Sequence, residues 1–110
     1  MARNDNNQVI KSSGNVFADL GLPNAVELDT KVRLGVAIHT VVERRKLSQA
    51  AMAAELGVNQ PKVSALMNYK LDGFSVERLI QFLVRLGQDV EISVKSKPSS
   101  RAARVAVKAA

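Results

Sequence analysis

Residues 49–68 read QAAMAAELGVNQPKVSALMN, a pattern of two short helices that meet at a glycine. Two helices that cross steeply through a short turn touch near the corner, so the contact residue there must be small, and Ala53 meets this need. The turn also needs a residue that accepts a positive φ, and Gly57 supplies it. Together with apolar Val58, Val63 and Leu66, this spacing predicts a helix-turn-helix.

The second helix of this motif has a predicted start and two predicted faces. Asn59 can cap it by accepting a bond from a free backbone N–H, and Pro61 fits its first turn, where a missing N–H breaks nothing. Val63, Leu66 and Met67 share one apolar face. The residues left pointing outward are Gln60, Lys62, Ser64 and Asn68.

Length and composition favour one cytoplasmic domain. The chain has 110 residues, 46% of them hydrophobic, few aromatics and no cysteine, which suits one small aliphatic core in a reducing compartment. No apolar run approaches the roughly 20 residues of a membrane span, and residues 1–14 lack a signal-peptide core. We therefore expect a cytoplasmic protein.

The positive charge of the chain is concentrated in its tail. The net charge is +6, which by itself suggests a polyanionic partner. Residues 1–94 hold eleven of the sixteen Lys and Arg and all ten Asp and Glu, so this part carries only +1. The other five are Lys95, Lys97, Arg101, Arg104 and Lys108.

The chain divides into a flexible N-terminus (1–13), a helix-turn-helix domain with a C-terminal strand (14–95) and a basic disordered tail (96–110). A long helix is expected from Asn24 to Lys46, and another follows Ser75 and ends at Gly87. Residues 88–95 alternate, which is typical of a half-buried strand. The predicted fold is mainly α: a compact helix-turn-helix bundle of about five helices with a short C-terminal β-strand.

Catalytic and metal-binding chemistry is poorly supported. The single histidine, His39, has only Glu43 as a potential partner at helical spacing, and one weak ligand pair does not make a metal or acid–base site. No glycine-rich phosphate loop is present. We therefore expect a packed or partly exposed histidine, no metal, no cofactor and no enzymatic activity.

The motif and its surroundings carry a family resemblance. The stretch LSQAAMAAELGVNQPKVSALMN resembles the phage-repressor-like (XRE) helix-turn-helix family, over roughly residues 32–86. The flanking stretches GNVFADLGLPNAVEL and LDGFSVERLIQFLVRLGQDVEI resemble a narrower group, HigA-like regulators encoded beside RelE/ParE-type toxins. The resemblance implies a DNA-binding transcriptional regulator that acts as antitoxin and autorepressor.

The resemblance also implies which residues meet DNA. Gln49 and Gln60 occupy the places of two family glutamines, the first contacting phosphate and supporting the second, which reads adenine through its amide. In place of the family's small polar residue, Pro61 favours contact with a thymine methyl group. The full predicted set is Gln49, Asn59, Gln60, Pro61, Lys62, Ser64, Asn68, Tyr69 and Lys70.

A single module makes few base contacts, so a homodimer on a palindromic operator is expected. The candidate dimer surface combines a second apolar stripe of the long helix with the alternating segment: Leu28, Val32, Val36, Val90, Ile92 and Val94. Two other readings stay open: a stand-alone regulator without a toxin, and a helical protein-interaction module without DNA binding.

Overall fold

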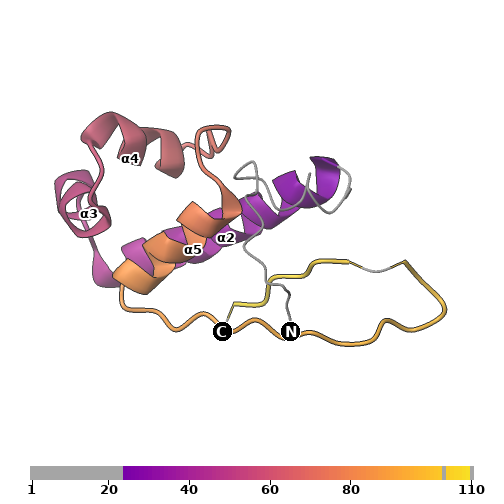
Figure 1. Ribbon diagram of the computed structural model, residues 1–110. Coiled ribbons are helices and arrows are strands. Elements are labelled where there is room, and N and C mark those ends of the chain that lie inside the picture. The colour runs from indigo at the N-terminus through magenta and orange to yellow at the C-terminus, as the bar shows by residue number, and fades with distance from the viewer. Residues whose placement is uncertain (1–23, 103, 110) are drawn as a thin grey trace, which may run out of the picture.

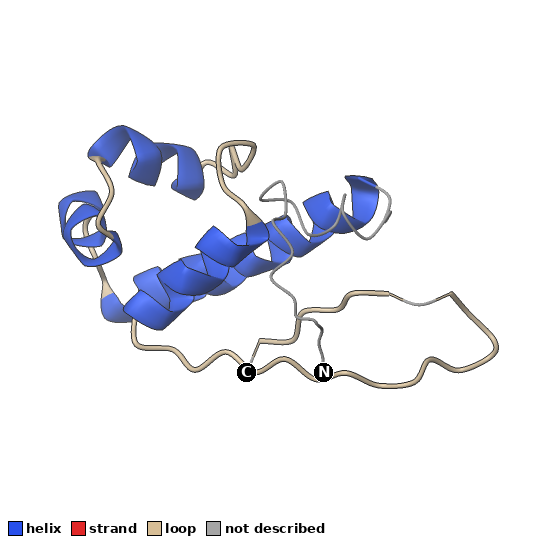
Figure 2. Ribbon diagram, viewed as in Figure 1, coloured by secondary structure: helices blue, strands red, loops and turns tan. Residues whose placement is uncertain are grey.

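The computed structural model describes residues 24–102 and 104–109. Four helices follow one another there: α2 (Asn24–Arg45), α3 (Gln49–Leu56), α4 (Gln60–Met67) and α5 (Val76–Arg85). No strand occurs in these two ranges, and the chain after α5 runs as extended segments and turns (Figure 2). The expectation of about five helices with a C-terminal β-strand is therefore wrong.

The absence of the strand at residues 88–95 has a physical reason. An alternating segment becomes a strand only when a neighbour receives its backbone hydrogen bonds, and the described chain offers residues 88–95 no such neighbour. Ile92 and Val94 accordingly remain 79% and 92% exposed. Within the described ranges the helices number four, one over residues 24–45 and three within residues 46–87.

The long helix α2 is the axis of the domain (Figure 1). Gly35 does not interrupt it, and its C-terminal end agrees with the expected one within a residue. One face is buried, including Leu34, Ile38 and Val42. Helix α5 lies along this face, while α3 and α4 close one end of the pair (Figure 1).

The cap predicted at Asn59 is confirmed, and Ser48 caps α3 in the same way. The Ser48 hydroxyl accepts a bond from the Ala51 N–H at 3.0 Å, and the Asn59 side-chain oxygen accepts one from the Lys62 N–H at 3.0 Å. Gly57 adopts a φ of +69° between α3 and α4, as the turn requires. The sequence therefore fixes the corner of the motif locally.

The core is aliphatic, as expected, with two phenylalanines added. Phe74 and Phe82 meet edge to face with ring centroids 5.7 Å apart. Every helix contributes to the core, whose fully buried members include Ile38, Met52, Leu56, Val63, Leu66, Leu79 and Phe82. None of the helices in the described ranges is long and apolar enough to cross a membrane.

An arginine fork joins three helices at the closed end of the domain. Both terminal nitrogens of Arg45 donate to the two carboxylate oxygens of Glu55, at 3.0 and 2.9 Å. One of them also donates to the Leu86 carbonyl at 3.3 Å. The ends of α2 and α5 are thereby tied to α3, which holds the motif on its scaffold.

Candidate nucleic-acid interface

The first turn of α4 presents an uninterrupted exposed surface. Gln60, Pro61 and Lys62 are all exposed, while Val63 and Leu66 point into the core. This division follows from helical periodicity, because residues three or four apart share a face. The helix that follows the tight turn therefore directs a polar amide and an ammonium group outward.

Gln49 and Gln60 occupy equivalent positions in the two motif helices. Each is the first residue of its helix, α3 and α4 respectively, and each is exposed. Within the described residues, neither side-chain amide makes a hydrogen bond. Both amides are thus available to an external partner, and a glutamine amide can pair with one base edge through a donor and an acceptor.

Asn59 has a structural role that the sequence already indicated. Its side-chain oxygen accepts a hydrogen bond from the Lys62 N–H and so stabilises the first turn of α4. The oxygen is therefore not free for a base edge.

We expect Asn59→Ala to lower the free energy of unfolding by about 1 kcal/mol, because a backbone N–H loses its partner. Asn59→Asp should retain wild-type stability, since aspartate caps equally well. Urea denaturation followed by circular dichroism measures both. Equal stability of the Ala variant and wild type would show that the cap contributes nothing.

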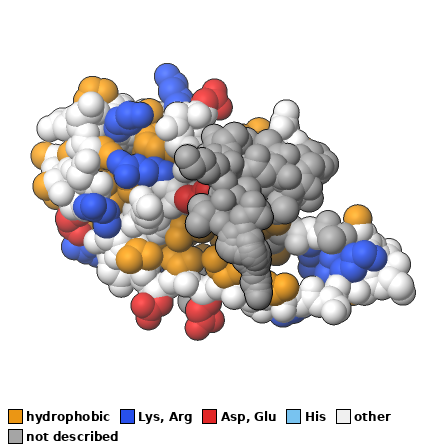
Figure 3. Space-filling model, viewed as in Figure 1, with side chains coloured by type: hydrophobic (Ala, Val, Ile, Leu, Met, Phe, Trp, Pro, Cys, Tyr) orange, Lys and Arg blue, Asp and Glu red, His pale blue; other side chains and the backbone are white. Residues whose placement is uncertain are grey.

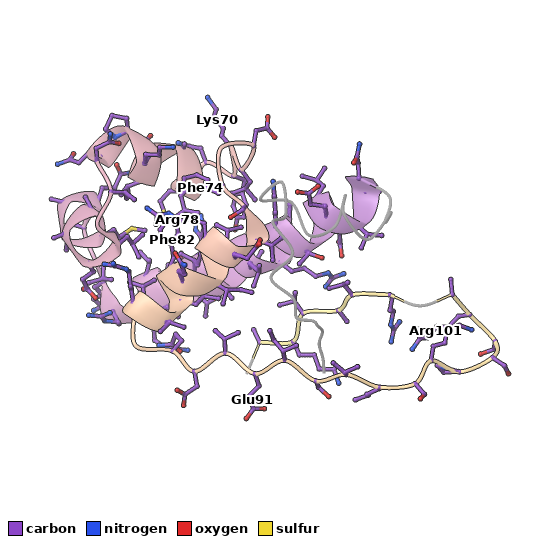
Figure 4. The ribbon with its side chains drawn as sticks, viewed as in Figure 1. Lys70, Phe74, Arg78, Phe82, Glu91 and Arg101 are labelled. Carbon is purple, nitrogen blue, oxygen red and sulfur yellow. The ribbon has the colours of Figure 1, made fainter. Side chains whose placement is uncertain are left out.

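Lys62 reaches from α4 towards the loop before α5. Its Nζ lies 5.5 Å from the centroid of the Phe74 ring, within cation–π range, and Arg78 stands similarly over Phe82 at 5.1 Å. Figure 4 shows Phe74, Arg78 and Phe82 between α4 and α5. Sequence reasoning did not single out Arg78, although its place three residues after the Ser75 cap puts a cation beside this surface.

Ser64 and Asn68 are coupled to each other. The Asn68 amide nitrogen donates to the Ser64 carbonyl at 2.9 Å and approaches its hydroxyl at 3.4 Å. Ser64 is half-buried, whereas Asn68 is exposed. Both side chains therefore stabilise the end of α4, and the other side of Asn68 stays open to solvent.

Tyr69 takes a backbone conformation that the sequence did not predict. Its φ is +57°, in the left-handed region that costs a residue with a side chain about 1–2 kcal/mol. The Tyr69 N–H donates to Leu66 O at 3.1 Å and the Lys70 N–H donates to Ala65 O at 2.9 Å, which closes α4. The ring stacks on His39, with centroids 4.7 Å apart and planes 5° apart.

His39 is a packed histidine, as expected. Besides stacking on Tyr69, its Nε2 lies 3.0 Å from the Met67 carbonyl oxygen at the end of α4. Within the described ranges, no group of three or more His, Cys, Asp and Glu side chains could hold a metal ion. His39 thus links α2 to α4.

Exposed cations are dispersed over one end of the domain. Lys70 projects away from the body beyond the end of α4 (Figure 4). Figure 3 shows Lys and Arg side chains dispersed over the end that carries α3, α4 and α5, with a separate group on the C-terminal segment. Exposed Lys62 lies on α4, Arg78 and Arg85 lie on α5, and exposed Lys70 lies in the loop between these helices.

The six candidate dimer residues fall into two groups. Leu28, Val32 and Val36 are 56%, 37% and 49% exposed along α2. Val90 instead packs against the core, while Ile92 and Val94 point into solvent. Only the α2 residues form a continuous exposed apolar stripe, because they recur every four residues on one helix.

Two helices joined by a tight turn, the second with a free polar first turn, define a helix-turn-helix protein of the DNA-binding class. The helix-turn-helix domain family matches residues 16–95. A solved structure described as "Putative XRE Family Transcriptional Regulator" is 62% identical and covers 80% of this chain and 100% of that chain, with a TM-score of 0.77. Among curated proteins, no match is found. The chain belongs to the XRE family of helix-turn-helix transcriptional regulators.

Proposed function

We propose that the protein binds a palindromic operator as a homodimer and reads it with α4. The observation that carries this proposal is the exposed Gln60 amide at the start of α4, which has no hydrogen-bonding partner in the described residues. An unpartnered amide at the first turn of a second motif helix is placed to enter the major groove.

The roles of the other residues are proposed from the family resemblance and from their place in the fold. Gln49, at the start of α3, supports Gln60 and a phosphate, and Pro61 contacts a thymine methyl group. Lys62 leaves the Phe74 ring for a guanine edge or a phosphate. Lys70 and Asn68 grip the DNA backbone beyond the end of α4.

The direct test is the ratio of two affinities at fixed salt. A duplex from the promoter of the protein's own gene should bind about a thousandfold or more tightly than a scrambled duplex of equal length and composition. Fluorescence anisotropy at several salt concentrations gives the ratio and the salt dependence. If the two duplexes bind equally, the measurement is repeated with duplexes selected from a random pool. Equal affinities in that second measurement would reject sequence-specific binding.

The proposed dimer uses the exposed stripe on α2. A second copy is the fitting occupant, because one module offers few base contacts and two half-sites about 34 Å apart would supply useful affinity. The stripe begins in the N-terminal part of α2, which extends away from α3 and α4 (Figure 1). Two copies can therefore pair without covering α4.

We expect sedimentation equilibrium at micromolar concentration to give twice the chain mass of 11.9 kDa. Val32→Asp should shift this mass to the monomer value, because a charge would be buried in an apolar contact. Val84→Asp is the matched control, since Val84 is an exposed valine on α5 outside the stripe. A monomeric wild type would reject the dimer.

We infer further that the operator belongs to a toxin–antitoxin pair and that the protein is the antitoxin and autorepressor. Support comes from the resemblance of residues 14–28 and 71–92 to HigA-like regulators. The candidate surfaces for a basic toxin are the N-terminal segment and the acids Glu27 and Asp29 of α2, which pair with Lys31 and Arg33. Co-expression with the adjacent gene should yield a co-purifying small protein; its absence favours a stand-alone regulator.

A further inference from the structure

The ring of Tyr69 covers one turn of α2, from Gly35 to His39. A Cβ atom at Gly35 would stand 3.1 Å from Tyr69 Cε1 and 3.3 Å from Cδ1. Contacts this close are tighter than ordinary packing, so the ring occupies the space that the missing side chain leaves. The same ring also stacks on the His39 imidazole.

His39 completes this contact by holding the end of α4. A carbonyl oxygen only accepts hydrogen bonds, so the Nε2 atom 3.0 Å from Met67 O carries the proton and donates. Tyr69 and His39 therefore grip the last turn of α4 through a ring stack and a hydrogen bond. Gly35 makes room for both by leaving the surface of α2 flat.

Helix α4 is short, so its stability and orientation depend on these contacts with α2. The helix has eight residues, and helices this short are marginal in water without tertiary contacts. Its N-terminal end is held by the turn at Gly57 and the Asn59 cap. Its C-terminal end joins α2 through Tyr69 and His39, and Lys70 follows directly.

The backbone strain at Tyr69 also indicates that its ring contacts matter. Glycine would adopt a φ of +57° freely, whereas a bulky residue stays there only when its surroundings hold it. What the chain gains at this position is therefore the ring and its contacts with α2. The residue is 41% exposed, and its hydroxyl makes no hydrogen bond within the described residues.

We propose that Tyr69 is a positioning residue: wedged between Gly35 and His39 of α2, it sets the orientation of α4, and it does not bind DNA through its hydroxyl. The inference rests on the proposed function in that α4 is the helix that reads the operator. It changes the role of Tyr69 from a backbone contact to a support for Gln60 and Lys70.

The experiment compares Tyr69→Phe, Tyr69→Gly, Gly35→Ala and the Gly35→Ala/Tyr69→Gly double variant. Tyr69→Phe keeps the ring and should bind the operator like wild type. Tyr69→Gly and Gly35→Ala should each lose about tenfold in operator affinity, the scale of one aromatic stack. The double variant should lose no more than Tyr69→Gly alone, because both changes act on one contact.

Affinity for a scrambled duplex separates positioning from contact. Non-specific binding is electrostatic, so it should stay within about twofold in every variant. A tenfold loss in Tyr69→Phe would overturn the proposal in favour of a hydroxyl contact. Unchanged operator affinity in Tyr69→Gly, with a lower urea midpoint only, would reduce Tyr69 to a purely stabilising residue.

A second measurement needs no DNA and so judges the wedge even if operator binding fails. In wild type, Gly35→Ala should lower the urea midpoint, because the new Cβ displaces the ring. In the Tyr69→Gly background the same change should raise it, because alanine is the better helix former. The same sign in both backgrounds would show that Tyr69 is not wedged on Gly35.

Discussion

The Gln60→Ala variant will lose operator affinity by about thirtyfold or more while keeping its helical circular dichroism. An amide paired with one base edge is worth about 1–3 kcal/mol, and a dimer loses it in both half-sites. The combined loss of about 2–6 kcal/mol corresponds to roughly thirtyfold to more than ten-thousandfold. Stability should hardly change, because Gln60 is exposed and makes no hydrogen bond in the described chain.

The Gln60→Ala/Lys62→Ala double variant should lose the remaining operator shift. The salt dependence of operator binding by Lys62→Ala alone identifies what Lys62 contacts. If Lys62 neutralises a phosphate, the log–log slope against salt falls by about 0.9 per half-site. Gln60→Ala alone should leave this slope unchanged. Gln81→Ala, an exposed glutamine on α5 outside the motif, is the control. Wild-type affinity of the double variant would rule out α4 as the reading helix.

The Phe82→Ala variant will lose about 3–5 kcal/mol of unfolding free energy, the usual range for a buried aromatic. Phe82 is fully buried, meets Phe74 edge to face and lies under Arg78. A domain of this size has a total stability of about 5–15 kcal/mol. Urea denaturation should therefore show a much lower midpoint, with partial unfolding in the absence of urea only if the wild-type stability lies near about 5 kcal/mol.

The control for this variant lies on the same helix. Val84 is 56% exposed, so Val84→Ala should change stability by no more than about 0.5 kcal/mol. A Phe82→Ala variant as stable as Val84→Ala would mean that the Phe74–Phe82 contact is not part of the core.

Features set by local chemistry were predictable from the sequence. Ser48, Asn59 and Ser75 accept bonds from the backbone N–H three residues on, which is a short-range property of the chain. The positive φ of Gly57 and Gly87 is equally local. The helices, their buried faces and the motif could therefore be predicted, and the family membership confirms the resemblance to XRE proteins.

Features set by contacts between distant residues were not predictable. The alternation around Ile92 indicated a strand, but a strand depends on a partner that the pattern cannot name. Nor does any sequence signal show that Tyr69 lies on Gly35 and His39, thirty residues earlier. The sequence shows that Gly35 and His39, four residues apart, lie on one side of a helix, but it does not show that the Tyr69 ring packs there.

The motif is built almost entirely from neighbours in sequence, and this governs how fast the binding surface forms. Residues 46–48 join α2 to α3, and residues 57–59 join α3 to α4. Domains dominated by such local contacts close only short loops, and they fold in about microseconds to milliseconds. After unfolding, α3 and α4 should therefore re-form within about that time.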